Sequence, residues 1–201
     1  MRPNSHSTKL RMKHLATLSL MLNLGVAGIY AQQRPLNMTF SGTMEGATAN
    51  LQPDTVTDEQ NVAGNGTLGP FTFRELHADT ASPQPSSTCS PGPYFPTVAG
   101  GGVFRFKDGS LLTVKVMEGS SICIDLTAGV GHLTVSYQIT GGTERFKGAS
   151  GTLTLTATLM PALVTASGRT PLLTNTGQLE GTISGVARGE NGQNDPQGAP
   201  R

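Results

Sequence analysis

Two stretches in the second half of the chain alternate strictly between apolar and polar residues. They are 133–140, Leu-Thr-Val-Ser-Tyr-Gln-Ile-Thr, and 152–159, Thr-Leu-Thr-Leu-Thr-Ala-Thr-Leu. Successive side chains of a strand leave opposite faces, so each stretch predicts a strand with one apolar and one polar face. The glycine-rich joint at 141–151 between them predicts antiparallel neighbours in a sheet with one dry side.

The same alternation recurs along most of the chain. It predicts further strands within 36–44, 64–76, 98–106, 111–117, 122–126 and 179–183. The sequence Lys-Asp-Gly-Ser at 107–110 predicts a tight hairpin turn, because its glycine takes the positive φ that such turns need.

Three other stretches are predicted to be loops because they are polar or rich in proline: 47–62, 78–96 and 160–176. The result is about eight strands, and a sheet that is apolar on one side must close on itself or pack against a second sheet. We therefore predict an all-β, antiparallel eight-stranded barrel, with a β-sandwich as the alternative.

Residues 1–31 have the pattern of a signal peptide. Four basic residues in the first 13 positions precede an apolar run at 15–29, and a small residue, Ala31, follows it. Cleavage after Ala31 is predicted. A retained membrane anchor is the alternative, but the run is shorter than the roughly 20 residues of a spanning helix, and Asn23 interrupts it. No membrane span is therefore expected after signal removal.

The sequence divides into three parts: the signal peptide at 1–31, a barrel domain at 32–187, and a tail at 188–201. The tail is predicted to be disordered because Gly, Asn, Gln and Pro dominate it. The mature protein is predicted to be secreted or periplasmic. Without residues 1–31 it holds ten basic and thirteen acidic residues, a net charge of −3. No basic patch remains to attract phosphates, which excludes nucleic acid as an expected partner.

The two cysteines, Cys89 and Cys123, both lie in the exported part and are predicted to form one disulfide. Cys123 shares a strand face with Asp125 and faces away from the isoleucines beside it. Its sulfur is therefore expected outside the core, where the 78–96 loop that carries Cys89 can reach it. Closing a chain loop of this length stabilises the fold by about 3 kcal/mol.

The segment 139–159, ITGGTERFKGASGTLTLTATL, resembles the allene oxide cyclase and dirigent-protein barrels, which carry a GGTGRF-like turn and a G-A-x-G joint between two strands. The matching residues are Gly141, Gly142, Thr143, Arg145, Phe146, Gly148, Ala149 and Gly151. The resemblance implies an eight-stranded antiparallel barrel. Plant members are often trimers, so it also implies a homo-oligomer.

The motif itself is architectural and carries no chemistry. Its glycines let the backbone bend sharply, and Phe146 is expected to plug one end of the barrel. Glu144 stands where the family usually has a third glycine, so the turn must take a conformation that a side chain tolerates. No catalytic residue of the family can be matched to a position here.

No metal site or cofactor is expected from the residue spacings. Two lone cysteines do not make a zinc site, and there is no phosphate-binding Gly-Lys-Ser/Thr run or paired-histidine motif. The acids Asp54, Asp58 and Glu59 lack the spacing of a calcium loop and are predicted to lie in a solvated loop.

The candidate ligand-binding residues are Tyr137, Arg74 and His77. Tyr137 is the one polar-tipped side chain on the apolar face of its strand, so it is either a core aromatic or a hydrogen-bond donor in a pocket. Arg74, Glu75 and His77 form a charged group near the end of a strand, where barrel pockets open; a solvated strand end is the plain alternative, and a lone histidine is usually a surface or capping residue.

Two functions remain open. The first, which the absence of a catalytic constellation favours, is an exported module without enzymatic activity that binds a small apolar molecule or acts as a scaffold. The alternative, implied by the resemblance, is an isomerase or cyclase that folds an unsaturated apolar substrate; such chemistry depends mainly on shape and a few polar groups. It requires ionisable side chains inside the barrel, and a wholly apolar, filled interior would exclude it.

Overall fold

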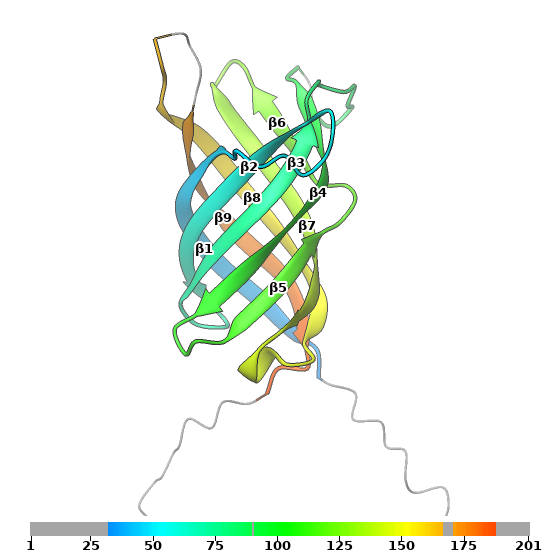
Figure 1. The fold of residues 1–201 in the computed structure, drawn as a ribbon, viewed down its shortest axis with the longest axis vertical. Helices are drawn as coiled ribbons and strands as arrows, with labels where there is room; N and C mark the ends of the chain where they lie inside the picture. The colour runs from blue at the N-terminus through cyan, green and yellow to red at the C-terminus, as the bar shows by residue number, and fades with distance from the viewer. Residues whose placement is uncertain (1–31, 90, 167–170, 188–201) are drawn as a thin grey trace, which may run out of the picture. The chain divides into compact units, whose positions relative to one another are not determined.

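The computed structural model describes residues 32–89, 91–166 and 171–187, so the predicted signal peptide and tail lie outside the described residues. This part of the chain folds as β-strands with one short 3-10 helix (Figure 1). The elements are β1 Arg34–Gly46, β2 Thr55–Gly66, β3 Phe71–Thr80, β4 Tyr94–Phe106, β5 Leu111–Val116, β6 Ser121–Asp125, β7 Val130–Gly142, η1 Glu144–Phe146, β8 Ser150–Leu163 and β9 Leu172–Ser184.

The strands form one closed antiparallel sheet. Its order is β3-β2-β1-β9-β8-β7-β5-β4, and β3 also pairs with β4, which completes the ring. β6 pairs with both β4 and β7, the same two neighbours as β5, so β5 and β6 together fill one position as a single strand interrupted at 117–120. The predicted eight-stranded barrel is confirmed, and the sandwich alternative is excluded.

Inward-facing apolar side chains fill the barrel, as the alternation at 133–140 and 152–159 predicts. β7 and β8 are paired from Gly131↔Leu159 to Ile139↔Gly151, and their apolar positions are buried while most of the interleaved threonines are exposed. On the neighbouring strands β3 and β4, the paired residues Phe73 and Phe104 stack with ring centroids 4.0 Å apart. Gly102 makes room for this pair, because a Cβ at that position would collide with the Phe73 ring.

The three predicted loops are shorter than expected, because each of the predicted segments contains strand residues. Residues 55–62 belong to β2, which the sequence prediction missed. The 78–96 loop is correct only from Ala81 to Pro93, because β3 runs on to Thr80 and β4 starts at Tyr94. Likewise β8 and β9 extend into 160–176 from both sides. Pairing with neighbouring strands overrides the low β-propensity of the Asp, Gln, Asn and Pro residues in these segments.

One end of the barrel is closed by η1 and the neighbouring turns at 67–70 and 107–110; we call it the plugged end. Phe146 is fully buried there against Phe106, with ring centroids 4.8 Å apart, as expected for a plug. The Arg145 guanidinium lies over both rings and pairs with Asp108, Nε to Oδ2, at 2.9 Å. Glu144 takes φ 50°, in the left-handed region that glycine adopts at less cost.

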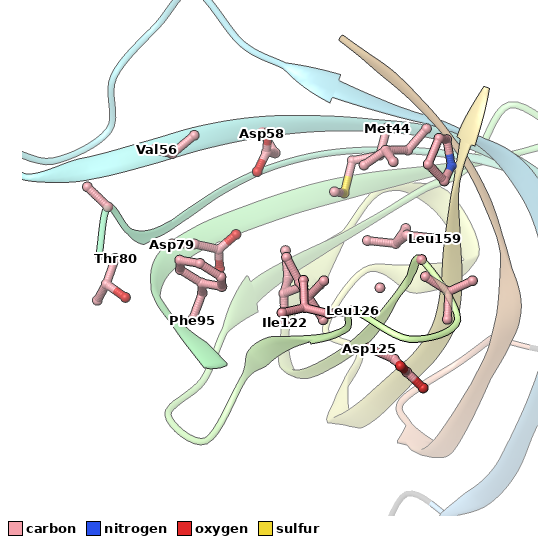
Figure 2. Close-up of a pocket in the computed structure, with 17 residues that line it drawn as sticks. Met44, Val56, Asp58, Asp79, Thr80, Phe95, Ile122, Asp125, Leu126 and Leu159 are labelled. Atoms are coloured by element: carbon pink, nitrogen blue, oxygen red, sulfur yellow. The ribbon is translucent and has the colours of Figure 1, made fainter. Parts of the chain in front are cut away.

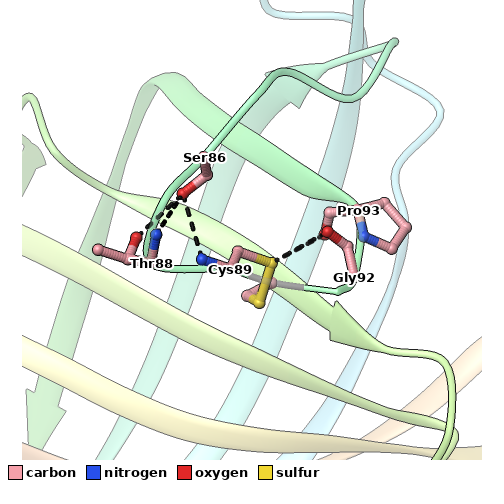
Figure 3. Close-up of a disulfide and its surroundings, with 6 residues drawn as sticks. Ser86, Thr88, Cys89, Gly92 and Pro93 are labelled. Carbon is pink, nitrogen blue, oxygen red and sulfur yellow. Dashed lines mark hydrogen bonds between the residues drawn. A yellow bond between two sulfur atoms is a disulfide. The ribbon is translucent and has the colours of Figure 1, made fainter.

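The opposite end is open, and a disulfide braces its outer wall. Cys89 and Cys123 are joined, with Cα atoms 5.6 Å apart, which confirms the predicted pairing (Figure 3). Cys123 lies on the outer face of β6, and Ser86 holds the approaching loop by accepting hydrogen bonds from the backbone N–H groups of Thr88 and Cys89. In the described part of the chain, no helix is long and apolar enough to cross a membrane.

Candidate functional site: a buried polar cluster beneath the open end

The inward side chains of strand β3 change from apolar to ionisable along its length. Its inward positions are Phe71, Phe73, Glu75, His77 and Asp79, and all five are buried. Each step of two residues advances about 6.6 Å along a strand. The two phenylalanines therefore lie toward the plugged end, and the three ionisable side chains lie in succession toward the open end.

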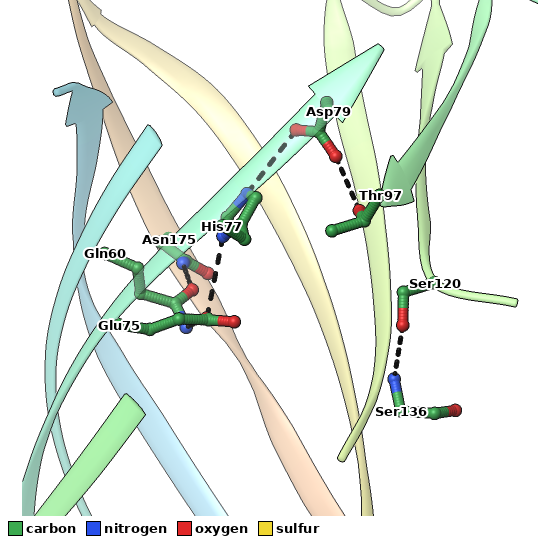
Figure 4. Close-up of polar contacts among 8 residues, drawn as sticks. All are labelled: Gln60, Glu75, His77, Asp79, Thr97, Ser120, Ser136 and Asn175. Atoms are coloured by element: carbon green, nitrogen blue, oxygen red, sulfur yellow. Dashed lines mark hydrogen bonds and ion pairs between the residues drawn. The ribbon is translucent and has the colours of Figure 1, made fainter. Parts of the chain in front are cut away.

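Neighbouring strands add amide side chains to this charged layer. Gln60 on β2 donates through Nε2 to Glu75 Oε2 at 2.9 Å. Asn175 on β9 donates in turn through Nδ2 to Gln60 Oε1 (Figure 4). The Glu75 carboxylate on β3 is therefore held by the Gln60 amide on β2, which is held in turn by the Asn175 amide on β9.

His77 lies between two carboxylates. Its Nδ1 is 3.7 Å from Glu75 Oε2, and its Nε2 is 3.5 Å from Asp79 Oδ2. The Thr97 hydroxyl on β4 donates to the other Asp79 oxygen, Oδ1, at 2.5 Å (Figure 4). Asp58 on β2 completes the group, since one of its oxygens lies within 4.8 Å of ligand atoms of both His77 and Asp79.

We refer to Asp58, Gln60, Glu75, His77, Asp79, Thr97 and Asn175 as the interior polar cluster. Several of its buried atoms have no hydrogen-bond partner among the described residues: Glu75 Oε1, both ring nitrogens of His77, Asp79 Oδ2 and Asn175 Oδ1, together with the nearby Tyr137 hydroxyl. Leaving one such atom unpaired costs about 1–3 kcal/mol. Unpaired polar atoms gathered in one place mark a functional site more than a stabilising network.

The electrostatics of the cluster follow from burial and from its surplus of carboxylates. Burial alone lowers the pKa of His77, but the carboxylates of Glu75, Asp79 and Asp58 outweigh burial and raise it to about 9. Burial raises the pKa of Asp79 to about 6, although His77 and Thr97 oppose the shift. Burial likewise raises the pKa of Asp58. Burial and the adjacent Glu75 carboxylate raise the pKa of Tyr137 well above its usual value.

An apolar cavity of about 440 Å³ leads from the open end to this cluster (Figure 2). Most of its wall is aliphatic or aromatic, and its acidic groups are Asp58, Asp79 and Asp125. The apolar wall is formed by Met44, Val56, Phe95, Ile122, Ile124, Leu126, Val130, Leu159, Pro161 and Leu173, with small residues between them. Among the described residues, no lysine or arginine lines it.

The structure brings two of the three candidate site residues together inside the barrel. His77 is fully buried in the cluster, so its expected place at the surface or as a cap is wrong. Tyr137 is fully buried on β7, edge-on to Phe73. Arg74 lies on the outer face of β3, where it pairs with Glu59 at 2.7 Å and its side chain is 71% exposed, so it does not join them.

The other members of the cluster were missed by the sequence prediction, although a signal for some of them exists. Continuing the alternation of Phe71 and Phe73 by two residues at a time places 75, 77 and 79 on the inner face. The prediction ended that strand at Leu76 and assigned Asp58 to a solvated loop. Both errors arose because charged residues at inward positions break the apolar pattern that identifies a strand.

Comparisons with known proteins add little to this description. No protein-family model matches the chain, and no curated protein matches it. Among solved structures, the chain is similar to that of the pterocarpan synthase dirigent protein GePTS1, with 11% sequence identity and a TM-score of 0.40 over 78% of this chain and 87% of that one. At that TM-score the similarity carries no argument, and the barrel assignment rests on the strand pairing itself.

Proposed function

We propose that this protein is an exported barrel that binds a small, largely apolar molecule through its open end. The observation that carries the proposal is the apolar cavity of about 440 Å³ that ends on the interior polar cluster. Pockets for small molecules typically measure about 300–1,000 Å³ and combine apolar walls with a few polar groups. The disulfide supports export, because such bonds persist in oxidising compartments.

The charges around the cavity narrow the chemistry of the ligand. The charged side chains on its wall are the carboxylates of Asp58, Asp79 and Asp125. A ligand with an anionic head would meet these groups in a poorly hydrated space, where like charges repel strongly. The proposed ligand is therefore neutral or cationic.

A neutral fluorescent probe, N-phenyl-1-naphthylamine, tests the proposal directly. We expect saturable binding that is tighter than that of the anionic probe anilinonaphthalene sulfonate. Leu173→Glu, which places a charge on the half-buried wall of the cavity, should weaken binding of the neutral probe by at least about tenfold. The matched control is Met117→Glu, since Met117 is exposed and does not line this cavity. Equal binding by both variants would contradict the proposal.

A second function, isomerase or cyclase, is favoured by one specific observation. The interior is not wholly apolar, because Glu75 and Tyr137 lie buried below the cavity with atoms that make no hydrogen bond to the described residues. In such an enzyme the cavity would fold an unsaturated apolar substrate, and the acids of the cluster on its wall, Asp58 and Asp79, would orient it before ring closure, with the Glu75 charge beneath them. The motif at 139–159 is architectural, so this alternative rests on the polar groups of the interior and not on the motif.

The enzymatic alternative is tested with the methyl ester of an unsaturated fatty-acid allene oxide generated in solution, because the free acid would carry the anionic head that the acidic wall of the cavity disfavours. Without protein its cyclisation gives both enantiomers, so an excess of one enantiomer on chiral chromatography would support catalysis. Glu75→Gln keeps the shape of the side chain and removes its charge, and it should reduce that excess. Tight binding of the neutral probe together with a racemic product would leave the binding function alone.

A further inference from the structure

We propose that the barrel binds one divalent transition-metal ion through Asp58, His77 and Asp79 at the floor of the open cavity. The inference is independent of the proposed apolar ligand, because it rests on the arrangement of these side chains and is tested with the metal alone. The three residues come from facing inward positions of the paired strands β2 and β3.

The first support is the spacing of the donor atoms. One ligand atom from each residue lies within 4.8 Å of the other two. His77 Nε2 and Asp79 Oδ2 are 3.5 Å apart. Two ligands held about 2.1 Å from one ion at a tetrahedral angle lie about 3.4 Å apart, so this pair already has the required separation. Asp58 is only half-buried, on the side of the cluster that lines the cavity.

The second support is that these donor atoms make no hydrogen bond. His77 is fully buried, and neither of its ring nitrogens makes a hydrogen bond to a described residue, although each lies within ion-pair distance of a carboxylate. Asp79 Oδ2, the oxygen that faces His77 Nε2 at 3.5 Å, likewise makes no hydrogen bond to a described residue. Thr97 holds the other Asp79 oxygen, which fixes the carboxylate with Oδ2 toward the imidazole. An ion between Nε2 and Oδ2 would coordinate both atoms.

The third support is the carboxylate behind the histidine. Glu75 Oε2 lies 3.7 Å from Nδ1, the nitrogen that faces away from Asp79, and Gln60 fixes that same oxygen. Metal-bound histidines usually donate their second N–H to a carboxylate or carbonyl, which sets the tautomer and the direction of the ring. Glu75 is therefore assigned as a positioning residue for His77, held in place by the amides of Gln60 and Asn175.

The charge balance indicates the kind of ion. Three carboxylates, Asp58, Glu75 and Asp79, share this space with one imidazole, and in the part of the chain that the structure describes no lysine or arginine lines the cavity above them. A divalent cation offsets this surplus. One imidazole nitrogen with two carboxylate oxygens suits Zn²⁺, and also Mn²⁺ or Fe²⁺, better than Ca²⁺, which prefers six or more oxygens. The remaining coordination position would face the apolar cavity, where water or a polar group of a ligand would occupy it.

The test is metal stoichiometry in the untagged protein. After treatment with a chelator and dialysis against Zn²⁺, we expect one equivalent per chain by inductively coupled plasma mass spectrometry. Asp79→Asn and Asp58→Asn should each weaken Zn²⁺ binding by at least about 100-fold. The matched control is Asp125→Asn, because Asp125 also lines the cavity but lies outside the cluster and caps a turn through Thr127 and Ala128. This control should keep one equivalent.

Two further measurements separate a built site from other outcomes. Co²⁺ in the wild-type protein should give a visible absorption spectrum typical of four- or five-coordinate nitrogen and oxygen ligation, which needs no variant to fold. Glu75→Gln should keep one equivalent but weaken it about 10–100-fold and shift the Co²⁺ spectrum, which a purely structural role would not do. Wild-type protein with no bound Zn²⁺, or full binding by Asp79→Asn, would overturn the proposal.

Discussion

The two ends of the barrel use charged side chains in opposite ways. At the plugged end, Arg145 pairs with Asp108, donates to the Leu68 carbonyl at 2.8 Å and lies on the rings of Phe106 and Phe146. The Arg145 guanidinium therefore has a carboxylate partner, a carbonyl acceptor and two aromatic rings against it. At the open end, buried charged groups of the interior polar cluster have unpaired atoms and a surplus of one sign. The first arrangement holds a fold together, whereas the second is maintained at a cost to stability and so indicates function.

The contrast lies within one continuous strand. β3 supplies two phenylalanines to the packed half of the barrel and Glu75, His77 and Asp79 to the other half. The packed half, with its stacked and edge-on aromatic pairs, supplies the hydrophobic stabilisation that lets the charged half exist. Substitutions at the plugged end should therefore change the free energy of unfolding, whereas substitutions at the open end should change ligand binding.

The largest expected effect is loss of the plug. Phe146→Ala removes a fully buried aromatic side chain and should lower the free energy of unfolding by about 3–5 kcal/mol, measured by urea denaturation. Binding of the neutral probe at the open end should not change at temperatures where the variant is folded. A variant that lost probe affinity and kept its stability would reverse the assignment of the two ends.

Removal of the disulfide should be the next largest effect. The double variant Cys89→Ser, Cys123→Ser removes the disulfide between residues 34 positions apart. It should lower the free energy of unfolding by about 3 kcal/mol. Treating the wild-type protein with a reductant before denaturation should reproduce the loss and leave the double variant unaffected. An unchanged denaturation midpoint would show that the bridge only decorates the outer wall.

A smaller effect on the free energy of unfolding is expected from low pH, through the Asp108 carboxylate at the plugged end. Hydrogen bonds from Ser110 and the nearby Arg145 guanidinium lower the pKa of Asp108. Because the folded-state pKa is depressed, the ionised carboxylate stabilises the fold above its ordinary pKa of 3.8, and this contribution is lost as pH falls through the folded value. Asp108 is half exposed, so the contribution is at most about 1 kcal/mol. Asp108→Asn should lower the free energy of unfolding by up to that amount at neutral pH and change it little at a pH well below the folded-state pKa, where Asp108 is already protonated. The acid limb of the pH–stability curve should become flatter by the same amount.

The smallest expected effect is at the strained turn of the plug. Glu144→Gly removes a side chain from a left-handed position and should raise the free energy of unfolding by about 0.5 kcal/mol, because relief of strain exceeds the added flexibility of the unfolded chain. Glu144→Ala is the control, since alanine keeps the strain. Equal stability of the two variants would show that the turn carries none.

The fold was predictable because its rule is simple and local. Alternation is unbroken over 36–44, 133–140 and 152–159, so the central parts of β1, β7 and β8 and their inner faces could be assigned from the residues alone. The segment that became β2 was not, because Asp58 and Gln60 stand at inward positions where an apolar residue is expected. The interruption of one barrel strand between Val116 and Ser121 was seen as a turn between two strands, yet the sequence does not show that both flank the same two neighbours.

The site was predictable only in part. Tyr137 was identified because it is polar on an apolar face, and His77 because it is rare. The contact between His77 and Asp79 depends on how far β3 extends, and that of Gln60 with Asn175 depends on strands 115 positions apart being brought together by ring closure. Sequence periodicity gives the face of a residue, but not which distant strand closes the barrel beside it.

The route of the chain through the barrel has a practical consequence. The first strand residue, Arg34, is paired with Ile183 in the last strand, and the Ala187 N–H donates to the Arg145 carbonyl at the plug. The polypeptide therefore enters and leaves the barrel at the plugged end (Figure 1), whereas the cavity opens at the other end. A protein immobilised on a sensor chip through a linker at either of these positions would present its cavity to the flowing solution.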